Sequence, residues 1–135
     1  MAGYSEKPLW KKLGCKADFA ACVENEPAGY LQMLELPHGI PVKWVKRAAV
    51  RIDFVHLFAS WKSEFGAKLK FFRGAIPSDG VIWISWPKEG SGVVTDNTED
   101  TIRAVTLPAG LVDIKVCAVD EILSGFKIMI RKELR

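Results

Sequence analysis

The segment 49–58 constrains the fold of this chain more than any other. Alternate residues of a strand point to opposite faces, and here both faces are largely apolar, with Ile52 and Phe54 on one and Val55 and Leu57 on the other. A strand covered on both sides is typical of a parallel sheet with helices packed on each face. The segment therefore predicts a central strand of an α/β protein.

The rest of the chain alternates between strand-like and helix-like segments. Segments 80–86 and 111–119 are apolar runs bounded by turns, and we expect them to be parallel neighbours of the 49–58 strand. Segment 126–131 follows after a short connection, so we expect it to pair antiparallel in a hairpin. Further strands are expected at 18–23 and 42–45, and helices at 8–13, 29–36, 60–73 and 96–107. This order predicts a three-layer sandwich, a mostly parallel sheet with a C-terminal antiparallel hairpin.

Helical spacing and strand position also predict where the large side chains lie. Trp61 and Leu31 fall on the inward faces of their expected helices, and Trp83 falls in the core. Trp86, at the exit of a strand, is placed to line a pocket or a contact between subunits. That placement leaves a homo-oligomer open.

Length and composition fit one domain spanning residues 1–135, without a membrane span. The chain is 49% hydrophobic and 26% charged, which is average for globular proteins, and no stretch approaches the roughly 18 apolar residues of a membrane helix. Its start lacks the apolar core of a secretory signal. The three cysteines form no CxxC motif, so we expect a cytoplasmic protein with buried free thiols. Cys15, in a predicted turn beside Lys12 and Lys16, is the candidate for a reactive thiol.

The net charge of +3 is spread along the chain. Nucleic-acid-binding proteins usually concentrate basic residues and interleave them with exposed aromatic ones. The run 43–47, Lys-Trp-Val-Lys-Arg, is the nearest approach to that pattern, and we interpret it as the solvated end of a strand. Binding to nucleic acid is therefore not expected.

The segment 86–98 is the strongest candidate for a ligand site. It leaves the C-terminal end of a predicted parallel strand and enters a helix, which is where open α/β sheets bind ligands. A lysine, a serine and glycine-flanked backbone amides suit an anion beside an apolar wall. The candidate ligand-binding residues are Trp86, Lys88, Gly90, Ser91 and Gly92. The alternative is a flexible loop leading to a helix capped by Asp96 and Glu99.

Two residues are candidates for catalysis, His56 near the end of the central strand and Asp120 at the end of the 111–119 strand. We prefer a structural alternative for each, a core histidine bonded to a backbone carbonyl and a carboxylate that stabilises the hairpin turn. No second His or Cys stands at metal-ligand spacing, so no metal site is expected. We therefore assign no catalytic residue.

Residues 52–132 resemble the second half of class I, Rossmann-like methyltransferases. Residues 52–56, Ile-Asp-Phe-Val-His, look like the fourth strand of that family, and 109–111 with 125–127 resemble its closing hairpin. More closely, the whole chain resembles a family of small, uncharacterised bacterial proteins. The shared motifs are Leu13-Gly14, Pro27 to Tyr30, Trp86 to Lys88, Val116 to Glu121 and Ser124-Gly125. The resemblance implies a fold and no established activity.

The chain departs from S-adenosylmethionine enzymes of that fold at both cofactor anchors. The family uses a glycine-rich turn after the first strand, whereas the turn 24–29 contains only Gly29. An acidic residue normally ends the second strand and grips the ribose, whereas Lys46 and Arg47 stand here. The connection from Val45 to Val50 is also too short for the usual helix and strand, so one sheet unit is expected to be missing.

These departures favour a non-catalytic binding or regulatory domain without a cofactor. Its expected partner is a small anionic ligand or another protein. The alternative is a small enzyme that acts on an anionic small molecule through the segment 86–98.

Overall fold

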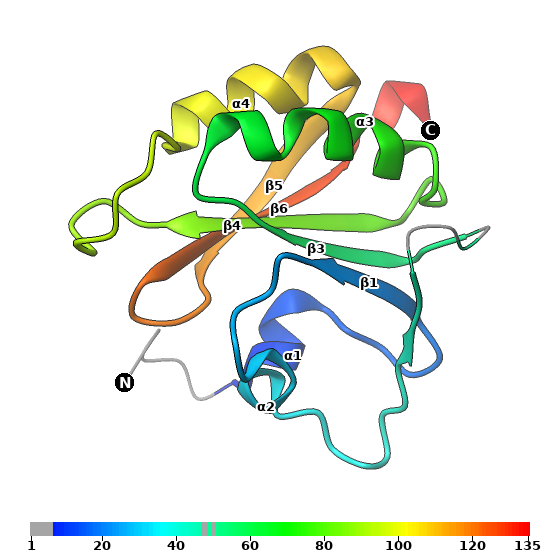
Figure 1. Ribbon diagram of the computed structural model, residues 1–135. Coiled ribbons are helices and arrows are strands. Elements are labelled where there is room, and N and C mark those ends of the chain that lie inside the picture. The colour runs from blue at the N-terminus through cyan, green and yellow to red at the C-terminus, as the bar shows by residue number, and fades with distance from the viewer. Residues whose placement is uncertain (1–6, 47–48, 50) are drawn as a thin grey trace.

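One six-stranded mixed sheet organises the protein (Figure 1). The computed structural model describes residues 7–46, 49 and 51–135. The strand order across the sheet is β2-β1-β3-β4-β6-β5. The strands are β1 (Ala20–Glu24), β2 (Lys43–Trp44), β3 (Phe54–Phe58), β4 (Val81–Pro87), β5 (Leu111–Ala118) and β6 (Leu123–Ile130).

Helices cover both faces of the sheet (Figure 1). Helices α1 (Leu9–Leu13) and α2 (Tyr30–Leu34) lie on one face, and α3 (Gly66–Arg73) and α4 (Glu99–Thr106) lie on the other. Short 3-10 helices are η2 (Lys62–Glu64), η3 (Leu107–Ala109) and η4 (Lys132–Leu134). The predicted three-layer α/β sandwich is confirmed. None of the described helices has the length and apolar character needed to cross a membrane.

The central strand β3 is buried along its whole length, as its two apolar faces predict. It pairs parallel with β1 on one side and with β4 on the other. The strand begins at Phe54 rather than at residue 49. The backbone of Asp53 still bonds to both neighbouring strands, donating to the Ala20 carbonyl and accepting the Val81 amide, and the chain leaves the sheet at Ile52. The Ile52 amide donates to the Ala75 carbonyl, and the Asp53 carboxylate accepts the Ala20 amide at 3.0 Å. Val50 lies outside the described residues.

The prediction that segment 111–119 lies beside β4 is wrong. Strand β6 lies between them and pairs antiparallel with both β4 and β5. Burial explains the order, because Phe126, Ile128 and Ile130 of β6 are buried whereas Ile114 and Val116 of β5 are more than half exposed. The more apolar strand takes the interior position, and β5 forms the edge with a register shift between residues 113 and 115.

Two apolar clusters fill the space on either side of the sheet. Under α3 and α4, the core includes Phe65 and Phe72. Under α1 and α2, Trp83 is fully buried as predicted, and its indole Nε1 donates to the Leu13 carbonyl at 2.8 Å. The sheet is thus anchored to both helical layers by large side chains.

Trp61 and Leu31, which helical spacing predicts to face the core, are instead 43% and 54% exposed. The helix expected at 60–73 is divided into η2 and α3, so helical spacing does not extend back to Trp61. The Glu64 carboxylate accepts hydrogen bonds from the backbone amides of Ser60 and Trp61. These bonds hold Trp61 outside the core. In the single turn of α2, Tyr30 and Leu34 occupy the inward face in place of Leu31.

Gly80 is expected to be the position in the turn before β4 that tolerates a side chain least. A Cβ there would lie 2.7 Å from Ile76 Cβ and 2.9 Å from Pro77 Cδ. Gly80→Ala should therefore lower the free energy of unfolding by about 1–3 kcal/mol, measured by urea denaturation. Gly39→Ala is the control, because a Cβ at Gly39 meets nothing within 4 Å. Equal stability of the two variants would contradict the expected clash.

Candidate functional site

Three cavities lie at the C-terminal ends of the parallel strands. One of about 350 Å³ lies at the ends of β1 and β2 and is lined by residues that include Tyr30 and Trp44. A second, of about 150 Å³, lies between the ends of β1, β3 and β4 beside Asn25 and Ser85. The largest of the three, about 440 Å³, lies between β4, β6 and the start of α4. We refer to the largest as the Trp86 cavity.

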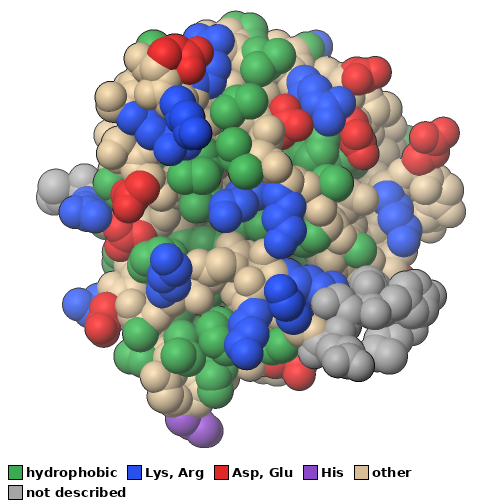
Figure 2. All heavy atoms as spheres, turned by 180° about the vertical axis from the view of Figure 1, so that it is seen from behind, with side chains coloured by type: hydrophobic (Ala, Val, Ile, Leu, Met, Phe, Trp, Pro, Cys, Tyr) green, Lys and Arg blue, Asp and Glu red, His purple; other side chains and the backbone are tan. Residues whose placement is uncertain are grey.

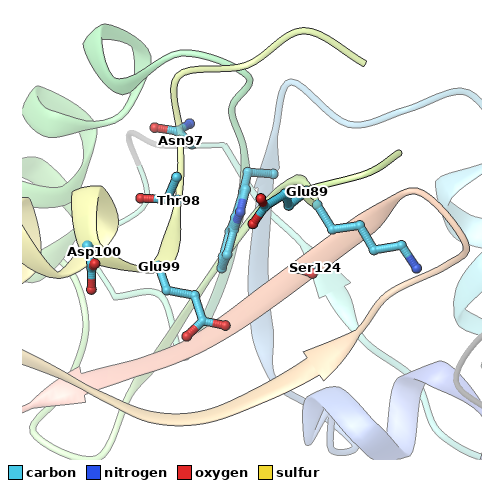
Figure 3. Close-up of a pocket in the computed structure, with 8 residues that line it drawn as sticks. Glu89, Asn97, Thr98, Glu99, Asp100 and Ser124 are labelled. Atoms are coloured by element: carbon cyan, nitrogen blue, oxygen red, sulfur yellow. The ribbon is translucent and has the colours of Figure 1, made fainter. Parts of the chain in front are cut away.

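The Trp86 cavity contains part of the site predicted from the sequence (Figure 3). Trp86 and Lys88 line it, but Gly90, Ser91 and Gly92 are not among its lining residues. The loop that carries these three continues past the cavity. The full lining is Trp86, Lys88, Glu89, Asn97, Thr98, Glu99, Asp100 and Ser124.

Hydrogen bonds from segment 95–97 hold one wall of the cavity against the end of β3. The Thr95 hydroxyl donates to the Ser60 carbonyl, and Asn97 Nδ2 donates to the Ala59 carbonyl at 3.1 Å. Asp96 accepts the Lys62 amide at 2.7 Å, so its predicted role as a helix cap is wrong. Thr98 caps α4 instead, because its hydroxyl accepts the Thr101 amide.

Internal bonds also shape the glycine-containing loop on the other side of the cavity. The Lys88 amide donates to the Ile122 carbonyl at 2.8 Å, which joins this loop to the β5–β6 turn. The Ser91 amide donates to the Lys88 carbonyl, and the Val93 amide donates to the Ser91 hydroxyl. Of the Gly90 to Gly92 amides that the anion prediction counted as available, that of Ser91 therefore already has a partner.

Asn97 is a lining residue that no sequence motif indicated. It is only 3% exposed, and its Oδ1 has no hydrogen-bond partner among the described residues. An unpaired buried acceptor costs about 1–3 kcal/mol, so such groups are rare in native proteins. No local signal distinguishes this residue, because an asparagine just before a helix resembles ordinary capping chemistry.

The charge of the lining is mostly negative. Glu89, Glu99 and Asp100 are the acidic residues of the lining, and Lys88 is the basic one. Elsewhere charge is more evenly mixed. On the face seen in Figure 2, Lys and Arg side chains are spread between apolar and acidic ones rather than gathered in one stripe.

His56 lies in the core and is bonded to two side chains. Its Nδ1 is 2.8 Å from the Tyr30 hydroxyl, and its Nε2 is 2.7 Å from the Ser85 hydroxyl. The prediction of a backbone carbonyl as its partner is therefore wrong. Burial lowers the pKa of His56 to about 3 and raises the pKa of Tyr30. A neutral imidazole with both nitrogens occupied joins α2 to β3 and β4.

The remaining candidates have structural surroundings. Asp120 lies in the β5–β6 turn, where its Oδ1 accepts the amides of Ile122 and Leu123. Cys15 is a buried free thiol, as expected, and burial raises its pKa to about 12, which opposes the alternative of a reactive thiol. Within the described ranges, His, Cys, Asp and Glu side chains form no group of three suited to a metal ion.

Several solved structures with a similar fold are methyltransferases, and another is described as a pericyclic reaction enzyme, with a TM-score of 0.59 at 11% identity over 93% of this chain and 47% of that one. A SAM-dependent methyltransferase from Aquifex aeolicus superposes with a TM-score of 0.65 at 16% identity, over 90% of this chain and 87% of that one. The magnesium protoporphyrin IX methyltransferase from Synechocystis gives 0.57 at 10% identity, over 85% and 75%. A putative type 11 methyltransferase from Sulfolobus solfataricus gives 0.53 at 11% identity, over 83% and 70%. The chain therefore has the class I, Rossmann-like methyltransferase fold.

The likeness extends to fold alone at these identities. No model of a protein family matches the sequence, and no curated protein is detectably similar to it. In the described part of the sheet, β2 is the edge strand on the side of β1, with no further strand beyond it. Of the basic pair predicted to follow β2, Lys46 is exposed and Arg47 lies outside the described residues.

Acid is expected to destabilise the protein through His56. An unfolded histidine gains a proton near pH 6.5, whereas folded His56 stays neutral until about pH 3. The unfolded state therefore binds more protons in this window, and the free energy of unfolding should fall by up to about 1.4 kcal/mol per pH unit as pH drops below 6.5. Urea denaturation between pH 7 and 5 measures this slope. It should flatten in His56→Gln and persist in His38→Gln, which alters an exposed histidine; equal slopes in both variants would refute the assignment.

Proposed function

We propose that this protein is a non-catalytic binding domain on a methyltransferase-like scaffold, with its ligand site in the Trp86 cavity. The observation that carries the proposal is the position of Asn25. Its side chain spans the crevice in which a protein of this fold would bind a ligand beside its first strand.

That crevice lies between β1 and β3, where the strand order reverses. The chain leaves β1 towards β2 and leaves β3 in the opposite direction, towards β4. Open α/β sheets bind ligands at such a switch point. Here Asn25 Nδ2 donates to the Phe58 carbonyl at 3.0 Å and links the ends of the two strands. The link reduces the room for a cofactor to approach the backbone.

The neighbouring cavity at the ends of β1 and β2 is not arranged like a ribose site. Trp44 ends β2 and lies edge-on to Tyr30, with 6.1 Å between ring centroids. The acidic residue of the lining is Glu26, which lies in the turn after β1 rather than at the end of β2. This arrangement supports a scaffold that has lost its cofactor anchors.

The enzymatic alternative has less support. His56 and Ser85 are fully buried and bonded to each other, so neither is presented to the Trp86 cavity. The carboxylates of that cavity also disfavour the anionic substrate that the alternative requires. The Asn25 bond crosses the crevice between β1 and β3, and the larger Trp86 cavity lies beside that crevice. This arrangement favours a ligand in the Trp86 cavity over a ligand in the crevice.

Isothermal titration with S-adenosylmethionine and S-adenosylhomocysteine tests the loss of the cofactor site. We expect no binding at micromolar concentrations, because the glycine turn and the acidic end of β2 are both absent from the sequence. Thermal unfolding of the same sample verifies that the protein is folded. Micromolar affinity for either compound would overturn the proposal.

A crystallographic fragment screen tests the position of the site. Bound fragments should gather in the Trp86 cavity, which is the largest of the three at about 440 Å³. Fragments that occupied the crevice between β1 and β3 and left the Trp86 cavity empty would refute the assignment.

A further inference from the structure

We propose that the side of the β5–β6 hairpin turned away from α4 binds an acidic segment of a partner protein. We call this surface the lysine face, and it consists of Val112, Lys115 and Cys117 of β5 with Lys127 and Met129 of β6. Trp86 belongs to the core on the α4 side of the sheet, so the lysine face is separate from the Trp86 cavity. The inference therefore goes beyond the proposed function.

The register of the hairpin places two lysines side by side on this face. Lys115 of β5 is the direct partner of Lys127 of β6, and Lys127 is in turn the partner of Trp83 of β4. Residues directly opposite each other in an antiparallel pair lie on the same face of the sheet. Trp83 belongs to the core under α1 and α2, so both lysines lie on that side. The lysine face thus continues that side of the sheet beyond β4.

The lysine pair has no counter-charge within the part of the chain that the structure describes. Neither Lys115 nor Lys127 takes part in an ion pair there. The carboxylate of Asp113, two positions before Lys115, accepts a hydrogen bond at 3.3 Å from Arg103 of α4, on the opposite side of the sheet. Like charges directly opposite each other destabilise a sheet. The fold therefore retains a repulsive pair that an anionic partner would neutralise.

Lys12 of α1 brings a third positive charge close to the pair. Cys117 follows Lys115 on the same face of β5, and burial raises the pKa of its thiol. The positive charges of Lys12 and Lys115 both oppose that rise, so both lie near the thiol. Lys12 also makes no ion pair with the described residues. The positive charge of this surface thus comes from two separate elements, α1 and the hairpin.

The lysine face is accessible to a partner. Lys115 is exposed, and the other four residues of the face are only half-buried. Helices α1 and α2 lie beneath β1 and β3 in Figure 1. A segment that docks here could place carboxylates against the lysines and apolar side chains against Val112 and Met129.

The composition of the face favours a protein over a nucleic acid or a membrane. Its five residues include no aromatic ring on which a base could stack. Membrane-binding basic clusters usually contain roughly four to eight Lys or Arg residues, whereas Lys12, Lys115 and Lys127 are the basic residues here. Apolar side chains beside polar ones, with methionine among them, are typical of protein interfaces. The partner chemistry is therefore an acidic segment that also carries apolar side chains.

Fluorescence anisotropy with matched peptides tests this partner class. The acidic probe is a fluorescein-labelled Leu-Glu-Glu-Leu-Glu-Glu peptide, and in its neutral match every glutamate is replaced by glutamine. We expect saturable binding of the acidic peptide at low salt, weakening as sodium chloride is added, and no binding of the neutral one. Unlabelled acidic peptide should displace the probe more effectively than oligothymidylate or phosphatidylserine vesicles.

Charge-matched variants locate the binding surface. Lys127→Gln should weaken peptide binding about tenfold, as expected for a charged hydrogen bond lost at a half-buried group. Lys115→Gln should weaken it about threefold, because water screens an exposed ion pair. Lys70→Gln removes the same charge from an exposed position of α3, on the other side of the sheet, and should leave the affinity unchanged.

Thermal unfolding without peptide tests the repulsion and verifies that the variants fold. Lys115→Gln removes one of two opposed like charges, so its Tm at low salt should exceed that of the unchanged protein. The gain should disappear at high salt, where the repulsion is screened. A Tm below that of the unchanged protein would show that Lys115 is already stabilised within the fold and would contradict the inference.

Four outcomes of the binding experiments would also overturn it. They are no saturable binding of the acidic peptide, equal binding of the neutral peptide, equal affinity in Lys127→Gln and Lys70→Gln, and stronger displacement by oligothymidylate or vesicles. None of them reverses the proposed function, because the S-adenosylmethionine titration and the fragment screen test other places on the molecule.

Discussion

The arrangement of the parallel strands at their C-terminal ends, where the cavities lie, depends on the two hydrogen bonds of His56. The residue lies in β3, in register with Val23 of β1 and Trp83 of β4, and its ring stacks on Phe58 with centroids 4.2 Å apart. Its bond to the Tyr30 hydroxyl attaches the first residue of α2 to β3, and Asn25, in the turn before α2, bonds separately to the Phe58 carbonyl at the end of β3. The switch-point crevice is therefore shaped from within the core, and the larger cavity opens further along the edge.

Much of the fold follows from local patterns. The two apolar faces of β3 indicate a central strand, because one strand can satisfy both faces only between two helical layers. The order of β5 and β6 does not follow in the same way. A hairpin can place either strand beside β4, and the choice depends on how much apolar surface each strand buries against α3, α4 and the remaining sheet.

The candidate site was also predictable only in part, because some of its residues come together only through tertiary contacts. Trp86 and Lys88 follow from the rule that ligands bind where parallel strands end. Asn97 and Ser124 join them through tertiary contacts, such as the bond from the Lys88 amide to the Ile122 carbonyl. The partners of His56 lie 26 and 29 residues away in the chain, so no local spacing indicates them. The sequence did not indicate the acidic residues of the lining, because Glu89 and the first turn of α4 are separated in the sequence and meet across the cavity.

The register shift in β5 has a consequence for how the protein behaves at high concentration. An exposed edge strand offers unpaired backbone groups to another chain, and a regular ladder would let sheets grow from one molecule to the next. The irregularity between Asp113 and Lys115 interrupts that ladder near the middle of the strand, and Lys115 places a charge on the exposed edge. Bulges and edge lysines both oppose aggregation. The apolar side chains of Ile114 and Val116 are thus displayed on a strand whose backbone resists amyloid-like extension.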